Sequence, residues 1–231
     1  MRQVVLEGDL AEQQNVSYIS EWRGLSAAQK LYLPFKRLFD IVVSVLALII
    51  CAPLFLIVAI AIKLDSPGPV FFHQEEIGKD GKLFLMYKFR SMVDNAHLLR
   101  NNLKEHNELE EPFFKITNDP RVTRVGKVIR KYSIDELPQL INVLIGQMSL
   151  VGPRPFAFYE VAGCPREIKA RRELIAPGLT CYWQVEGRSN ITLFHEKMEL
   201  DMRYIEELSP LTDIKILLKT VPAVISGDGA Y

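Results

Sequence analysis

The longest apolar run in the chain spans residues 41–62, where no position is charged and Val, Leu, Ile and Ala predominate. A helical run of about 20 residues is long enough to cross the hydrocarbon core of a bilayer. Basic residues lie on both sides of it, with Lys36 and Arg37 before the run and Lys63 after it. The pattern therefore predicts a membrane helix.

Pro53, near the middle of this run, leaves two topologies open. Proline removes an intrahelical hydrogen bond and kinks a helix. A straight helix would span the bilayer, whereas a helix broken at Pro53 would enter one leaflet and return to the same face. Hydropathy and the positive flanks do not choose between the two topologies.

The polar pattern after the membrane segment predicts a boundary and then a small hairpin. Residues 65–69, D-S-P-G-P, are a strong breaker of regular structure. Apolar residues 70–72 and 83–87 flank a loop that contains Asp80 and Gly81, which predicts a β-hairpin. We expect an α+β fold, mostly helical with this small antiparallel β-hairpin. The expected segments are an N-terminal tail (1–33), a membrane segment (34–65) and a main domain (66–231).

Other segments of the main domain carry helical periodicity or turn signals. Residues 121–131 hold five basic residues and no acid, opposite apolar positions. They predict an amphipathic helix whose cationic face meets an anionic membrane surface or a nucleotide diphosphate, or is simply solvated. Residues 166–173 predict a charged helix, and residues 181–185 an extended segment. An apolar stripe over residues 214–225 predicts a helix interrupted at Pro222.

A further helix is predicted from Ser133 to Gly146. Ser133 and Glu136 have the spacing of a capping box, and glycine is a common helix stop. This interpretation places Asp135 and Glu136 in the first turn, where the helix dipole favours negative charge. Beyond the helix, a Gly-Pro-Arg-Pro turn holds Arg154 in a fixed direction.

The acid pair and several arginines suggest phosphate chemistry. Adjacent helical residues point in different directions, so Asp135 is available as a nucleophile or metal ligand, while Glu136 caps, binds metal or moves a proton. A carboxylate that attacks a phosphate needs cations nearby. Arginine forks and an oxygen-ligated ion such as Mg²⁺ both supply them. Candidate arginines lie beside Gly, Pro or element ends: Arg90, Arg130, Arg154 and Arg188. Simple helix capping and surface ion pairing are the alternatives.

Composition narrows the classes of site. Lys plus Arg and Asp plus Glu both number 28, so net charge gives no case for nucleic acid. The three cysteines are far apart and contain no C-x-x-C pair, which argues against a disulfide framework or a thiolate metal site. The four histidines show no H-E-x-x-H spacing, so a zinc site is not expected.

Six motifs occur in order along the chain: F-K-R-L-F-D (35–40) before an apolar run with a central proline, Y-K-F-R-S-M (87–92), D-E-L-P-Q-L-I-N-V-L (135–144), M-S-L-V-G-P-R-P (148–155), P-G-L-T (177–180) and G-R-S-N (187–190). With these motifs, residues 34–231 resemble the bacterial sugar transferases, the monotopic phosphoglycosyl transferases, in their small form.

The resemblance implies transfer of a sugar 1-phosphate from a UDP-sugar to a polyprenol phosphate, with UMP released. Asp135 would be the nucleophile and a ligand of Mg²⁺, Glu136 would be catalytic, and Pro53 would break a re-entrant membrane helix. With the candidates above, the expected substrate-binding residues are Lys82, Arg90, Arg130, Gln139, Arg154, Gly187, Arg188 and Asn190.

The resemblance also implies partners and a location. The acceptor would be undecaprenyl phosphate in the bacterial inner membrane, and the catalytic domain would face the cytoplasm, in capsule, exopolysaccharide or O-antigen assembly. No nucleic acid partner is expected. Glucose or galactose is favoured as the sugar, and the oligomeric state, including a homodimer, stays open. The alternatives are a membrane-anchored nucleotide-binding scaffold without turnover and a lipid-phosphate phosphatase.

Overall fold

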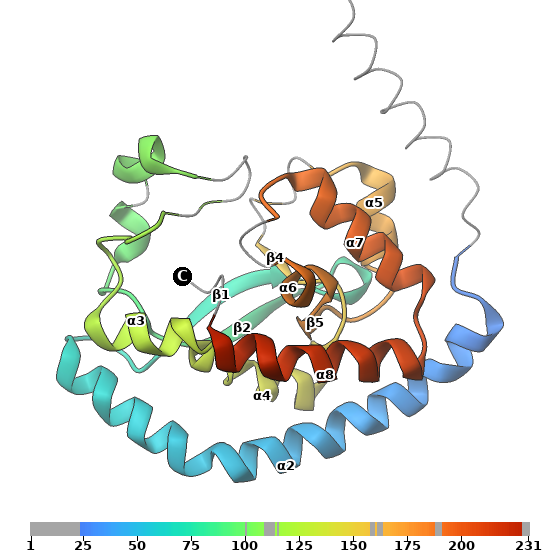
Figure 1. Cartoon of the computed structure of the whole chain (residues 1–231), viewed down its shortest axis with the longest axis horizontal. Helices are drawn as coiled ribbons and strands as arrows, with labels where there is room; N and C mark the ends of the chain where they lie inside the picture. The colour runs from blue at the N-terminus through green and yellow to red at the C-terminus, as the bar shows by residue number, and fades with distance from the viewer. Residues whose placement is uncertain are drawn as a thin grey trace, which may run out of the picture.

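The computed structural model describes residues 24–99, 101–108, 114, 116–157, 160, 164–187 and 191–227. One long helix, α2, arches beneath a domain of mixed helices and strands (Figure 1). The strands are β1 (Phe71–Ile77), β2 (Leu83–Phe89), β3 (Ser149–Val151), β4 (Phe156–Ala157) and β5 (Gly178–Thr180). The α-helices are α2 (Ala27–Asp65), α3 (Arg124–Lys131), α4 (Gln139–Ile145), α5 (Arg166–Arg172), α6 (Tyr182–Glu186), α7 (Phe194–Glu206) and α8 (Pro210–Ser226).

Helix α2 is continuous from Ala27 to Asp65 and passes through both Pro34 and Pro53. It opens with a capping box, because Ser26 accepts a hydrogen bond from the Gln29 backbone and the Gln29 side chain accepts one in return. The expected break at Pro53 is therefore not seen. A proline removes one hydrogen bond and bends a helix without having to end it. Residues 27–33, expected in the tail, belong to the helix.

The two ends of α2 are tied to the same domain. Near its start, Arg37 donates to the carbonyl oxygens of Val143 and Leu144 at the end of α4, at 2.5 and 2.7 Å. At its end, the Asp65 carboxylate accepts a hydrogen bond of 3.0 Å from the Val125 backbone at the start of α3. The outward face of the middle is apolar and exposed. By length and composition, α2 is able to cross a membrane.

The predicted hairpin is confirmed. Strands β1 and β2 pair antiparallel from Phe71 opposite Phe89 to Ile77 opposite Leu83, and β4 adds to the free edge of β1. Strands β3 and β5 form a separate parallel pair. The main core lies between the hairpin, α4, β3, α7 and α8. Its most deeply buried side chains include Val143, Met148, Tyr204 and Ile216.

Two local predictions are wrong. Residues 182–186 form α6 where the sequence predicted an extended segment. The Tyr182 ring packs edge-on against Tyr204 and its hydroxyl donates to the Glu207 carboxylate, so tertiary contacts override strand propensity. Helix α8 continues through Pro222 as far as Ser226 and ends where Gly227 adopts a left-handed conformation. The predicted helices at residues 121–131 and 166–173 are confirmed as α3 and α5.

Candidate active site

The acid pair lies in a short 3₁₀ helix, Ile134–Glu136, between α3 and α4. The predicted capping box is wrong, because Ser133 has a left-handed backbone, with φ of 52°, and its side chain caps nothing. Pro138 separates the 3₁₀ helix from α4. It cannot donate a backbone hydrogen bond, so regular α-helix starts only at Gln139. The tight turn packs against β2 and α3. Asp135 and Glu136 thus sit on a turn that β2 and α3 hold in place.

Glu136 is the anionic partner of two cations from distant parts of the chain. Its Oε1 lies 2.8 Å from Arg154 Nη2 and 3.5 Å from Lys88 Nζ. Burial opposes ionisation of this carboxyl, but the charges of Arg154 and Lys88 outweigh burial and hold its pKa well below the usual range. Glu136 is therefore ionised at neutral pH and fixes both cations beside the turn.

Asp135 has the opposite electrostatics. Burial, followed by the negative charge of Glu136, raises its pKa above the ordinary aspartate value, although Lys88, Arg130 and Arg154 pull it down. Within the described part of the chain, no hydrogen bond or ion pair engages the Asp135 carboxylate. Two neighbouring acids thus differ in role: one anchors the cations, and the other is left available for chemistry.

Lys88 is a site residue that sequence reasoning missed. It lies on β2, and its Nζ approaches the same oxygen of Glu136 that binds Arg154. The available signal was strand alternation. Phe84 and Met86 are buried on one face of β2, and Lys88 is the next residue in that series. A lysine in line with buried apolar residues needs an anionic partner.

Arg154 is held at its backbone as well as at its guanidinium. Arg172, on α5, donates a hydrogen bond from Nη2 to the Arg154 carbonyl oxygen, and its Nε lies 3.2 Å from the buried Asp201 carboxylate on α7. The Arg154 guanidinium lies over the Trp183 ring, 5.6 Å from its centre. The sequence predicted a turn that fixes the direction of Arg154, and in the structure its guanidinium meets Glu136, with α5, α6 and α7 contributing contacts around it.

The other residues predicted to bind substrate do not all lie beside the acid turn. Gln139 is buried directly after the acid turn, and the Arg130 charge acts on Asp135 from α3. Gly187 ends α6, where an added Cβ would lie 2.6 Å from the Ile191 side chain. Lys82 lies at the far end of the hairpin, six residues from Lys88, or roughly 20 Å along an extended strand. Arg188 and Asn190 lie outside the described residues.

Arg90 requires a correction, because the structure gives it an architectural role. Its guanidinium donates to the carbonyl oxygens of Ser66, Pro67 and Pro69 at 2.6–2.8 Å, and also to the Ser66 hydroxyl. These bonds fix the turn between α2 and β1. Because the guanidinium N–H groups of Arg90 are bonded within the protein, this arrangement argues against a contact between Arg90 and the substrate.

Glu76 is a buried acid that sequence reasoning did not single out. It lies on β1 directly opposite Phe84, and only 3% of the residue is exposed. Its Oε2 has no hydrogen-bond partner within the described residues. Burial raises the pKa of Glu76 to about 7, against the attraction of the positive charge on Lys88. Ionised Glu76 is therefore destabilising in the folded protein.

We expect Glu76→Gln to stabilise the protein at pH 8. The folded pKa lies above the unfolded value, so the stability associated with this group is present below about pH 4 and is lost as pH rises through 7. Glutamine cannot ionise and so avoids this loss, and we expect the free energy of unfolding to rise by roughly 2–3 kcal/mol at pH 8. Thermal unfolding in detergent at pH 5 and pH 8 measures the effect. An equal difference between variant and wild type at both pH values would contradict the assignment.

The described residues contain no group of three or more His, Cys, Asp or Glu side chains that could hold a metal ion. Magnesium in phosphate-processing sites is commonly bound by one or two carboxylates together with substrate phosphates. Asp135, whose carboxylate is disengaged within the described part of the chain, is chemically suited to be such a ligand. The donor set therefore fits an ion that is completed by the substrate.

Comparison with known proteins identifies one family and several relatives of known name. Residues 31–227 match the family model described as bacterial sugar transferase. The chain is 44% identical over 199 residues to the galactosyl transferase CpsE of Streptococcus agalactiae, covering 86% of this chain and 44% of that protein. It is 43% identical over 201 residues to the undecaprenyl-phosphate galactose phosphotransferase of Salmonella typhimurium, covering 85% and 41%.

A third relative is similar in length. The exopolysaccharide production protein ExoY of Sinorhizobium fredii is 39% identical over 202 residues, which cover 85% of this chain and 88% of that protein. The chain thus spans less than half the length of the first two relatives and most of the third. The match to the family model extends from within α2 to the end of α8 and includes the acid turn, Lys88 and Arg154. The protein belongs to the bacterial sugar transferase family.

Proposed function

We propose that the protein transfers a sugar 1-phosphate from a UDP-sugar to undecaprenyl phosphate and releases UMP. The observation that carries the proposal is the acid turn. Asp135 is half-buried and its carboxylate is disengaged within the described residues, next to a Glu136 whose charge is offset by Arg154 and Lys88. A turn of this kind suits a nucleophile that must approach an anionic phosphate. The names of the relatives support a sugar phosphotransferase reaction.

In the first step, an Asp135 oxygen attacks the phosphorus that carries the sugar. A new carboxylate–phosphorus bond forms, and the bond from that phosphorus to the oxygen shared with UMP breaks. The electron pair leaves with UMP, and the phosphosugar remains on Asp135 as an acyl phosphate. Arg154 and Lys88 offset the negative charge that gathers during this step, and Glu136 keeps the Arg154 fork directed at the turn.

In the second step, a phosphate oxygen of undecaprenyl phosphate attacks the same phosphorus. The acyl–phosphate bond breaks, and the Asp135 carboxylate is restored. A nucleophile next to a membrane helix can meet a soluble donor first and a lipid acceptor second. Mg²⁺, held by Asp135 and the donor's phosphates, would supply further neutralisation of the diphosphate.

The membrane topology that we propose is re-entrant, with the domain on the cytoplasmic face of the bacterial inner membrane. Contacts at the two ends of α2 support it, because Arg37 and Asp65 both bind the same domain. A helix that crossed the bilayer straight would carry these two residues to opposite faces. Pro53, near the middle of the apolar run, provides the bend that a return to the same face requires.

Cysteine labelling tests the topology. In a chain whose native cysteines are replaced by serine, Lys30→Cys and His73→Cys lie before and after the apolar segment, and both positions are exposed. We expect both to react with an impermeant maleimide only after the cytoplasmic face becomes accessible. Labelling of the two positions from opposite faces would establish a spanning helix and overturn the re-entrant proposal.

Purified membranes test the activity. Incubation with a panel of UDP-sugars, Mg²⁺ and undecaprenyl phosphate is expected to release UMP and to form a lipid-linked sugar diphosphate from one or a few donors. Glucose and galactose donors are the first to test. Release of inorganic phosphate without a lipid-linked sugar would indicate a phosphatase, and donor binding without UMP release would indicate a scaffold. Either result would contradict the proposed function.

A further inference from the structure

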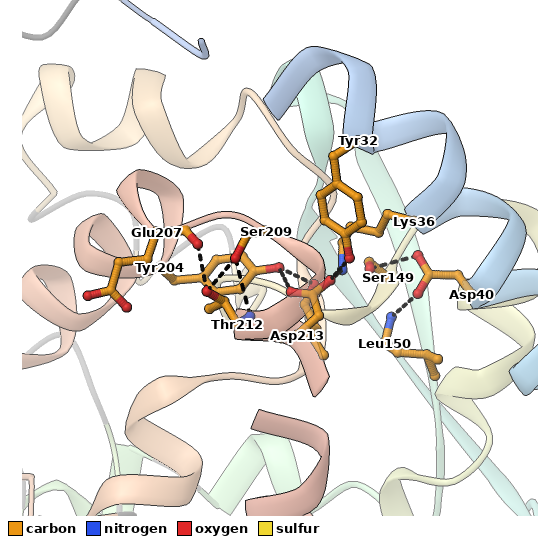
Figure 2. Close-up of polar contacts among 11 residues, drawn as sticks. Tyr32, Lys36, Asp40, Ser149, Leu150, Tyr204, Glu207, Ser209, Thr212 and Asp213 are labelled. Atoms are coloured by element: carbon orange, nitrogen blue, oxygen red, sulfur yellow. Dashed lines mark hydrogen bonds and ion pairs between the residues drawn. The ribbon is translucent and has the colours of Figure 1, made fainter. Parts of the chain in front are cut away.

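Strand β3, which leads to Arg154, is hydrogen-bonded directly to the membrane helix. Figure 2 shows Asp40 of α2 facing Ser149 and Leu150. Asp40 Oδ2 accepts a hydrogen bond of 2.7 Å from the Ser149 hydroxyl, and Oδ1 accepts one of 3.1 Å from the Leu150 backbone. All three residues are buried. One side chain of the membrane helix therefore fixes two of the three residues of β3.

A second polar path reaches the third residue of β3. The Asp213 carboxylate, at the start of α8, accepts hydrogen bonds from Tyr32 at 2.8 Å and from Lys36, both on α2. The Tyr204 hydroxyl lies 2.7 Å from Asp213 (Figure 2). The same hydroxyl lies 3.0 Å from the Val151 carbonyl oxygen. Both paths begin on α2 and end on β3, so a displacement of α2 is transmitted to this strand.

The connection from β3 to Arg154 has little freedom. Gly152 packs so closely against its neighbours that a Cβ there would lie 2.6 Å from the Ala176 carbonyl oxygen. The Pro153 carbonyl oxygen accepts a hydrogen bond of 2.8 Å from Gly178, and that of Arg154 accepts one from Arg172. Proline on each side of Arg154 restricts the backbone further. The position of β3 therefore sets the direction of the Arg154 guanidinium.

We propose that Asp40 is a positioning residue for the transfer reaction. Through β3, it couples the position of α2 against the domain to the direction of the Arg154 guanidinium. The proposal rests on the proposed function, in which Arg154 offsets phosphate charge. It predicts that the phosphate site is fully assembled only when α2 lies against the domain. Asp40 itself touches no reacting atom and acts through β3.

Asp40→Ala removes both hydrogen bonds to β3. We expect kcat/KM for the UDP-sugar to fall by about 10- to 100-fold, since small misplacements of a catalytic group cost this much. Asp40→Asn is the conservative variant, because its amide can accept from the Leu150 N–H and donate to the Ser149 hydroxyl. We expect Asp40→Asn to stay within about threefold of wild type. Equal losses in the two variants would overturn a positioning role.

A double-mutant cycle tests whether Asp40 acts through Arg154. Adding Asp40→Ala to Arg154→Lys is expected to cost less than about threefold, because the directed fork is already gone. Adding it to Lys88→Ala is expected to cost the full 10- to 100-fold. Lys88 approaches Glu136 from β2 and is the matched control, since the described hydrogen bonds of Asp40 go to β3 and not to β2. Equal costs in the two backgrounds would exclude the coupling.

Hydrogen exchange supplies a readout that does not depend on activity. In the full-length protein, Asp40→Ala should speed exchange of the Leu150 amide and of its neighbours up to Arg154. Gln29→Ala should leave them unchanged, because the described hydrogen bonds of the Gln29 side chain go to the Ser26 backbone and to the carbonyl oxygens of Ile205 and Glu206, and none goes to β3. Unchanged exchange in Asp40→Ala would overturn the proposal, whatever the activity.

Failure of the inference can be separated from failure of the proposed function. If the wild-type protein releases no UMP, the proposed function fails, and exchange at Leu150 still tests the coupling. If the wild type is active and Asp40→Ala retains full kcat/KM, only the inference fails. Should Asp40→Ala not accumulate in membranes, Ser149→Ala removes one of the two hydrogen bonds, with an expected loss of about 3- to 10-fold.

Discussion

Replacing Asp135 with asparagine is expected to lower the rate of UMP release by about 10⁴-fold or more. Asparagine keeps the shape of aspartate but cannot form the acyl phosphate, and loss of a nucleophile has effects of this size or larger in other enzymes. The fold should persist, because no hydrogen bond or ion pair of the described residues depends on the Asp135 carboxylate. Single-turnover UMP release from a UDP-sugar in purified membranes measures the change.

Asp80→Asn is the matched control for this experiment. Asp80 lies at the exposed tip of the hairpin with a left-handed backbone, which asparagine also tolerates. We expect it to leave both activity and membrane association unchanged. Membrane association should also be unchanged in Asp135→Asn. Full activity in Asp135→Asn would remove the nucleophile from the mechanism.

Replacing Arg154 with alanine is expected to lower kcat by about 10²- to 10³-fold, the loss typical of a preorganised group that stabilises developing charge. Glu136 would lose its 2.8 Å partner and keep only Lys88, at 3.5 Å. The pKa of Glu136 would rise, because the Arg154 charge is the largest influence that holds it down against burial. Steady-state kinetics with the UDP-sugar, combined with a pH profile of kcat, measure both consequences.

Arg154→Lys distinguishes charge from geometry. Lysine restores a positive charge but not the planar fork, so we expect recovery of about tenfold relative to alanine and not of the full rate. Complete recovery in Arg154→Lys would show that direction is unimportant at this position. Wild-type kcat in Arg154→Ala would exclude Arg154 from the transfer step.

The features that depend on a local sequence pattern could be predicted from the sequence. The uncharged run predicted most of α2, and two apolar stretches around Asp80-Gly81 predicted the hairpin, although β1 continues to Ile77, well beyond the first stretch. The acid pair and Arg154 could be singled out because the Gly-Pro-Arg-Pro turn and the adjacent carboxylates are unusual in themselves. That they meet in space, 18 residues apart in the chain, is a tertiary fact that the structure supplies.

The remainder of the site could not be predicted because it depends on how elements pack. Lys88 and Arg90 are two residues apart and would share a face of one strand, yet β2 ends at Phe89 and the chain turns. Lys88 consequently reaches Glu136, whereas Arg90 binds the turn at residues 66–69. Glu76 is similar: its sequence surroundings are polar, and only pairing with Phe84 shows that it is buried.

The start of the acid turn shows how a local rule can fail. The spacing of Ser133 and Glu136 satisfies the capping-box pattern, but Glu136 is drawn to Arg154 and Lys88, and Ser133 adopts a left-handed backbone. An ion pair across elements thus overrides a local hydrogen bond. The exception occurs at the candidate nucleophile's own turn, where the geometry serves the site instead of helix capping.

Mass spectrometry of the protein trapped with donor alone tests the central claim most directly. Without undecaprenyl phosphate, the second step cannot proceed, so a phosphosugar should accumulate on the protein as UMP is released. After rapid acid quenching and digestion, we predict a hexose phosphate adduct on the peptide that contains Asp135 and none on the corresponding peptide of Asp135→Asn. Efficient formation of lipid-linked sugar with no adduct on that peptide at any time would contradict a covalent mechanism.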